Sequence, residues 1–271
     1  MLSTDDMAAF GAGTFNTAYD DPADSTMCYV RTVIQSCDPF RLANALRMMQ
    51  CHKPVISYLD DGAVAVTIHI RRGVTLVDLV HGPFIRIVGS APDFSELKHL
   101  LRCILMQLDM RHAVGIAHND VKAENIIALD GGYDLIDDGM SIDTRILPRV
   151  ALQPYMTSSS VRAPWMCEGL DGVCCVDASK GDVWALGVTA LGLLNGAPLV
   201  TFPDDMEGDT VTAGTACYFR HLFASADRSD VCPLLAAAPR ALSDLLLQMT
   251  ALRANDVPSA SAALLHPAFR D

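Results

Sequence analysis

The chain has 271 residues, 51% of them hydrophobic, and a formal net charge of -12, so it can fill a sizeable core in one large domain or two lobes. Its 20 basic residues are scattered rather than clustered, which excludes the electrostatic footprint of a nucleic-acid-binding protein. No signal peptide opens the chain, and its nine cysteines form no C-x-x-C pair. We therefore expect reduced thiols and an intracellular protein, in the cytoplasm or the nucleus.

Residues 1 to about 70 contain short apolar runs broken by Gly, Asp and Pro, which predict strands. The runs are around Ala8 to Tyr19, Met27 to Ile34 and Ala63 to Ile70. Between them, Pro39 to Cys51 has leucines and methionines at helical spacing after Asp38, a suitable N-cap. This part of the chain is predicted to be a strand-rich lobe with one helix.

From about residue 72 onward the pattern becomes helical. In Ser95 to His112 one face is apolar, and its residues are Leu97, Leu100, Leu101, Ile104, Leu105 and Leu108. Further helices are expected at 182–195, 215–226, 238–252 and 258–266. We predict an α+β chain forming a single two-lobed domain over 1–271, with a small antiparallel lobe at 1–70 and a larger helical lobe at 71–271.

One uncharged stretch, Val183 to Val200, is close to the length needed to span a bilayer. Gly187, Asn195 and Pro198 interrupt it, and no Lys/Arg asymmetry flanks it. A helix that is apolar all round can equally be the central helix of a large lobe, so we expect no membrane partner.

The segment GIAHNDVKAENIIALDGGYDLIDDGMS carries the chemistry. It places His118, Asp120, Lys122 and Asn125 at fixed spacing, and Asp137 follows twelve residues after Asn125. This pattern resembles the H-R-D-L-x-x-x-N catalytic loop and the D-F-G metal-binding turn of protein kinases.

The resemblance implies a role for each of these residues. Asp120 would accept the proton of a substrate hydroxyl, and Lys122 would neutralise the transferred phosphoryl group, as in serine/threonine-specific kinases. Asn125 and Asp137 would supply oxygen ligands to Mg²⁺ beside ATP. His118 is expected to be a buried packing residue.

Three downstream segments extend the resemblance to roughly residues 8–269. RAPW at Arg162 to Trp165 is similar to the A-P-E that ends an activation segment. GDVWALGVTALGLLNGAPL at 181–199 is similar to the central buried helix, whose leading Asp182 holds the catalytic loop. The C-terminal segment ends in HPAF, similar to the H-P-x-F of many kinases.

The small lobe departs further from the family pattern. FGAGTFNTAY at 10–19 is similar to the glycine-rich phosphate loop, with Gly11 and Gly13 in place and Asn16 at the third glycine; an ordinary Gly-x-Gly turn is the alternative. Arg31 aligns with the phosphate-pairing lysine of V-A-I-K and Tyr29 with its small alanine. Residues 38–59 contain no Glu to pair with that cation.

The large lobe has its own departures. Asp138 replaces the apolar residue of D-F-G and is expected to face solvent or a cation. Asn119 replaces the loop arginine that reads a phosphorylated activation segment, which argues against control at Thr157 or Ser158–Ser160 and favours a flexible polar loop there. Trp165 and Val257 replace both ends of a buried ion pair, a change that can be neutral or stabilising.

Two functions follow from the resemblance. The first is an ATP- and Mg²⁺-dependent serine/threonine protein kinase acting on a protein substrate, with Arg31 as a substitute phosphate anchor. The second is a pseudokinase, a binding or allosteric module with little or no catalysis. A small-molecule kinase is a third alternative, against which the activation segment and terminal helices argue. In its brevity and altered motifs the chain is also similar to the reduced kinases of large DNA viruses.

Overall fold

The computed structural model describes residues 9–12, 16–34, 55–58, 63–79, 86–88, 91–145, 158–166, 177–200, 217–224 and 231–270. The predicted helix at 39–51 lies outside the described residues, as do Gly13 and Thr157. The chain divides into two compact units, residues 1–74 with 137–142 and residues 75–136 with 143–271.

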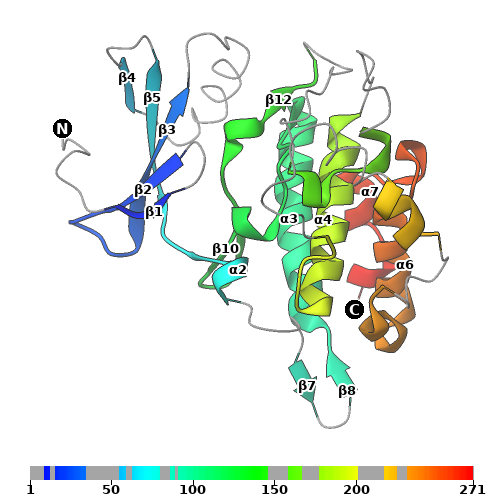
Figure 1. Ribbon diagram of the computed structural model, residues 1–271. Coiled ribbons are helices and arrows are strands. Elements are labelled where there is room, and N and C mark those ends of the chain that lie inside the picture. The colour runs from blue at the N-terminus through cyan, green and yellow to red at the C-terminus, as the bar shows by residue number, and fades with distance from the viewer. Residues whose placement is uncertain are drawn as a thin grey trace. The chain divides into compact units, whose positions relative to one another are not determined.

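Within the described part of the first unit, five strands form an antiparallel sheet in the order β1-β2-β3-β5-β4 (Figure 1). The strands are β1 (Ala9–Ala12), β2 (Asn16–Asp20), β3 (Met27–Ile34), β4 (Val55–Tyr58) and β5 (Val64–Arg71). The described residues of the three predicted apolar runs thus form strands, and those of the first run form two, β1 and β2. An antiparallel sheet can bury one face and leave the other polar, which matters for the residues on β3.

The second unit is built around two long helices that contact each other, α3 (Ser95–Ala113) and α4 (Ala178–Asn195). The predicted apolar face of α3 is confirmed, since all six of its residues are fully buried. The α4 helix begins at Ala178 rather than at residue 182, because the Asp177 side chain accepts a hydrogen bond from the Lys180 N–H and caps its first turn. The helix ends at Asn195 and is followed by Gly196, whose φ of 75° suits glycine.

Helix α4 is buried over almost its whole length, as predicted for the central helix of a large lobe. A Cβ atom on Gly187 would come within 2.9 Å of the Met249 and Thr250 side chains, so glycine lets the end of α6 (Arg240–Met249) pack closely against α4. Trp184 of α4 packs edge-on against Trp165 and Phe219. Among the described helices, none combines the length and apolar character required to cross a membrane.

The remaining elements are short. Residues 217–222 are helical and α7 (Ala260–Leu264) packs against α3, so the predicted helices at 215–226, 238–252 and 258–266 each contain an observed helix. The other elements are β6 (Val74–Thr75), α2 (Leu76–Leu79), β7 (Arg86–Val88), β8 (Ala91–Asp93), β9 (Ile116–Ala117), β10 (Ile126–Leu129), β11 (Gly132–Leu135), β12 (Ile142–Asp143), and the 3-10 helices Ala123–Asn125, Asp138–Met140, Ser159–Val161, Pro164–Met166, Pro233–Ala237, Ala254–Asp256 and Pro267–Phe269.

Candidate active site

The loop from His118 to Asn125 runs from β9 to β10 and is held by a carboxylate from α4. Asp182 is 1% exposed and accepts hydrogen bonds from the backbone N–H groups of His118, at 2.8 Å, and Asn119, at 2.7 Å. These bonds confirm the expected contact between Asp182 and the loop. Because both N–H groups are buried, the carboxylate satisfies donors that water cannot reach.

A histidine on α3 completes this anchor. His112 Nε2 lies 2.9 Å from Asp182 Oδ2, so one carboxylate joins α3, α4 and the loop. Asn119 adopts a left-handed conformation with φ of 66°. Asparagine tolerates this conformation better than most residues, which favours its presence where the family has arginine.

The ring of His118 is fully buried, as predicted, and both of its nitrogens have partners. Nε2 lies 3.0 Å from the Ile136 carbonyl oxygen and Nδ1 lies 3.3 Å from the Asp120 backbone N–H. The carbonyl can only accept and the N–H can only donate, so the pattern assigns the proton to Nε2. His118 thereby ties the loop to the end of β11.

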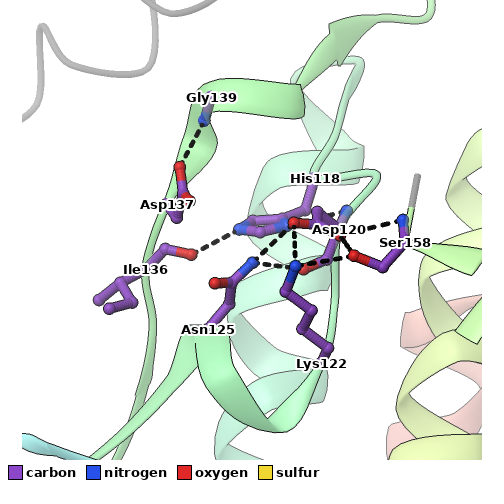
Figure 2. A network of polar contacts seen from close by, with 8 residues as sticks. All are labelled: His118, Asp120, Lys122, Asn125, Ile136, Asp137, Gly139 and Ser158. Atoms are coloured by element: carbon purple, nitrogen blue, oxygen red, sulfur yellow. Dashed lines mark hydrogen bonds and ion pairs between the residues drawn. The ribbon is translucent and has the colours of Figure 1, made fainter. Parts of the chain in front are cut away.

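The Asp120 carboxylate is the centre of a polar network (Figure 2). Its Oδ2 accepts from Lys122 Nζ and Asn125 Nδ2, each at 3.0 Å, and its Oδ1 accepts from the Ser158 hydroxyl at 2.7 Å. Lys122 Nζ also donates to Ser158 Oγ at 2.7 Å. The three predicted loop residues therefore meet at one point, together with a serine 38 positions further along the chain.

This network sets the charge of Asp120. Burial alone raises the pKa of the carboxyl group, but the positive charge of Lys122 and the hydrogen bonds from Ser158 and Lys122 outweigh it, so the pKa lies below the ordinary value. Asp120 is thus ionised at neutral pH and able to accept a hydrogen bond or a proton.

The turn from Asp137 to Gly139 belongs to the first unit. Asp137 has φ of 67°, and its Oδ1 accepts from the Gly139 N–H at 3.1 Å. Asp138 is half-buried and its Oδ1 lies 3.4 Å from the Ser141 hydroxyl, so this carboxylate is not sealed in an apolar site. The tight turn leaves Asp137 Oδ2 with no hydrogen bond from a described residue.

The residues expected to hold phosphate lie on the sheet of the first unit. Gly11 pairs with Ala18, and Arg31 pairs with Thr17 on one side and Thr67 on the other. Tyr29 stacks on His69, with ring centroids 4.5 Å apart and an interplanar angle of 18°. The role of Arg31 as a phosphate anchor stays a prediction.

The replaced ion pair is apolar at both ends, as predicted. Trp165 and Val257 are 8% and 1% exposed and belong to the same hydrophobic core. The side chain of Lys180 also donates to the Val257 carbonyl. A hydrogen bond from α4 thus helps to hold the segment in which the family places an arginine.

The protein kinase domain family matches residues 47–269. Together with the fold and the loop geometry, this match shows that the chain belongs to the protein kinase family.

The chain is similar to several curated proteins, among them protein kinases. It is 28% identical to testis-specific serine/threonine-protein kinase 3 of Homo sapiens over 151 residues, 53% of this chain and 52% of that protein. It is 27% identical to calcium-dependent protein kinase 7 of Oryza sativa subsp. japonica over 211 residues, 69% of this chain and 35% of that protein. It is 28% identical to myosin-IIIb of Mus musculus over 172 residues, 57% of this chain and 12% of that protein. These matches span about half or less of the relatives' own length.

Proposed function

We propose that the chain is a single protein-kinase domain, with lobes at 1–70 and 71–271, that transfers the γ-phosphoryl group of ATP to a serine or threonine hydroxyl of a protein. The observation that carries this proposal is the ionised Asp120 carboxylate held between Lys122, Asn125 and Ser158. A general base needs to be ionised and within hydrogen-bond reach of the proton that it takes, and Lys122, which pairs with this carboxylate, is partly exposed.

Two side chains fit a magnesium ion. Asn125 uses its Nδ2 on the Asp120 carbonyl and carboxylate, and no described residue donates to its Oδ1. Asp137 Oδ2 likewise receives no hydrogen bond from the part of the chain that the structure describes. Amide and carboxylate oxygens are ligands that Mg²⁺ accepts together with phosphate oxygens, so Asn125 and Asp137 would hold the ion.

ATP with Mg²⁺ would supply the phosphoryl group and part of the charge neutralisation. In the proposed reaction the substrate oxygen forms the new bond to phosphorus while the bond to ADP breaks, and the hydroxyl proton passes to Asp120. Lys122 would neutralise charge on the transferred phosphoryl group. Gly11 and Gly13 would let the phosphates of ATP approach the backbone N–H groups. Asp182 acts through the loop backbone and is a positioning residue.

The test is Mg²⁺-dependent transfer of labelled phosphate from ATP to a generic basic protein. The native chain should label serine or threonine, and Asp120→Ala should abolish the label. Asp130→Asn, which changes an exposed carboxylate in the turn between β10 and β11, should retain it. No transfer by a folded native chain with varied divalent ions would refute the proposal.

A pseudokinase is the second candidate. It is favoured by the absence of Glu between residues 38 and 59, and by Arg31 and Tyr29 at the positions where the family has its lysine and its small alanine. It predicts a stable fold, with or without bound nucleotide, and no turnover. A thermal-shift titration with ATP and Mg²⁺ shows whether nucleotide binds, because a ligand of the native state must raise the melting temperature.

A further inference from the structure

The Ser158 hydroxyl is held directly on the carboxylate of the candidate active site (Figure 2). It donates a hydrogen bond to Asp120 Oδ1 at 2.7 Å and accepts one from Lys122 Nζ at 2.7 Å. The directions are fixed, because an ionised carboxylate can only accept and an ammonium group can only donate. The serine proton therefore points at the carboxylate that is proposed as the general base.

A serine oxygen in this position has the features of an activated nucleophile. Such a nucleophile needs a base within about 2.6–3.2 Å and a further group that orients the base. Asn125 Nδ2 and Lys122 Nζ orient Asp120, each at 3.0 Å from its Oδ2. The hydroxyl oxygen of Ser158 has two lone pairs. Lys122 uses one of them, and no described residue donates to the other, which is left to form a bond.

The backbone of Ser158 is held as well. Its N–H lies 3.3 Å from the same Asp120 oxygen, and its carbonyl accepts from the Val161 N–H at 3.2 Å, where the 3-10 helix Ser159–Val161 forms. This short helix contacts α4, and Val161 belongs to the hydrophobic core. All of these residues lie in the second unit, so the whole arrangement is described within one unit.

These contacts are the ones that an acceptor hydroxyl needs. In the proposed reaction the acceptor gives its proton to Asp120 and lies beside Lys122, and Ser158 already meets both conditions. An ionised carboxylate accepts about four hydrogen bonds, and Asp120 receives them from the N–H and the hydroxyl of Ser158, from Lys122 and from Asn125. A hydroxyl from another protein has to displace one of these donors, whereas Ser158 is in place.

We propose that Ser158 is the chain's own phosphoryl acceptor, so that the domain phosphorylates itself at this residue within one molecule. This inference rests on the proposed kinase function and names one acceptor for it. The Ser158 Oγ forms a bond to the γ-phosphorus of ATP, and the bond between that phosphorus and the oxygen of ADP breaks. ADP keeps the electron pair, and the serine proton passes to Asp120 Oδ1.

The modification closes the site. A phosphoserine carries a charge of about −1.5 to −2 at neutral pH, which here lies beside the ionised Asp120, and it no longer donates the hydroxyl proton. Lys122 pairs with the bound phosphate and is lost to a second phosphoryl group. Transfer to other proteins should therefore fall as Ser158 becomes phosphorylated. This form of control needs no arginine in place of Asn119, because the phosphate acts on the base directly.

The experiment follows Ser158 in the native chain, which is first treated with a phosphatase that is then removed. With ATP and Mg²⁺ and no other protein, mass spectrometry should find one phosphoryl group on the peptide that carries Ser158, and fragmentation should place it on that residue. Raising the chain concentration about tenfold should leave the rate unchanged, because an intramolecular step does not depend on it.

Two variants control this measurement. Asp120→Asn should abolish phosphorylation of Ser158. Ser160→Ala should retain it, because Ser160 is partly exposed and, in the part of the chain that the structure describes, makes no hydrogen bond to Asp120 or Lys122. Melting temperatures without ATP establish that each variant is folded.

The outcomes separate this inference from the proposed function. Phosphorylation of Ser158 at a rate independent of concentration supports it, as does a matching fall in transfer to a generic basic protein. Phosphate on the basic protein with none on Ser158 would overturn it and leave the proposed function standing. A rate that rises in proportion to chain concentration, or full transfer by a chain phosphorylated at Ser158, would overturn it as well. No transfer to either acceptor would refute the proposed function and this inference with it.

Discussion

Replacement of Asp182 by alanine tests how the catalytic loop is held. The change removes the acceptor for the backbone N–H groups of His118 and Asn119, which are 0% and 4% exposed as residues. Each buried donor left without a partner costs about 1–3 kcal/mol, so the variant should lose about 2–6 kcal/mol of unfolding free energy. A typical domain has only about 5–15 kcal/mol in total.

Two further variants separate the lost hydrogen bonds from other effects. Asp182→Asn keeps the side-chain size but has one acceptor oxygen instead of two, so most of the loss should remain. Asp177→Ala removes an acid from the same helix, where it caps the Lys180 N–H at 3.3 Å, and should cost about 1 kcal/mol.

The assay is urea unfolding followed by tryptophan fluorescence, with equal slopes required for the comparison. Phosphate transfer measured on the folded fraction should fall as well, because the loop that carries Asp120 loses its anchor. If Asp182→Ala loses no more stability than Asp177→Ala, the carboxylate does not hold the loop and the reasoning is refuted.

Three more predictions concern stability. Trp165→Glu should lower the melting temperature strongly, because it puts an unpaired carboxylate at a position that is only 8% exposed. Adding Val257→Arg should recover part of this loss. Thermal melts of the single and double variants check this, and a double variant no more stable than Trp165→Glu would show that the two positions do not pair. Lys180→Met should cost about 1 kcal/mol by removing the bond to the Val257 carbonyl. Urea unfolding checks this, with Arg102→Met at an exposed position of α3 as the comparison, and equal stability of the Lys180→Met variant and the native chain would show that the bond does not stabilise the fold. Folding lowers the pKa of Asp120, so its ionised carboxylate contributes stability at pH values above the unfolded pKa of 3.8, and this stability is lost as pH falls through the lower folded pKa. Asp120→Asn should therefore make the free energy of unfolding depend less on pH in this acidic range. Identical pH dependence of unfolding in the native chain and in Asp120→Asn would contradict this assignment.

The regular elements with strong patterns were predictable from the sequence. The apolar run at Met27–Ile34 and the six-residue face of α3 follow from alternation and helical periodicity alone. The helix α4 begins four residues before the predicted residue 182, because its N-cap is Asp177 and not the motif residue Asp182. The sequence does carry this signal, since an Asp directly ahead of a helical run predicts an N-cap.

Contacts between distant residues were not predictable in the same way. The polar composition around Ser158 predicts a flexible loop, yet the Ser158 hydroxyl donates a hydrogen bond to Asp120 and accepts one from Lys122. The helical pattern places His112 at the end of a helix, yet its ring contacts Asp182, 70 residues away. Neither contact leaves a signal in the local sequence, because each joins residues that only the folded chain brings together.

Face assignment on β3 shows a different limit. Alignment to a motif cannot detect a shift of one residue when the motif residues themselves are substituted. Such a shift moves each side chain to the other face of the sheet. The pairs Val30–Ile68 and Arg31–Thr67 supply the missing register. Because this strand has no lysine, the pairing of β3 with its neighbours, and not the motif alone, decides on which face of the sheet Arg31 lies.

The most direct test of the proposed function is the single-turnover rate of phosphate transfer in the native chain and in Asp120→Asn at saturating ATP and Mg²⁺. General-base catalysis predicts that the rate falls by about 10²–10⁴-fold, while the rise in melting temperature caused by ATP with Mg²⁺ stays the same in both proteins. Equal rates, or a native chain whose melting temperature rises with ATP but which transfers no phosphate, would contradict the proposal that Asp120 makes this chain an active kinase.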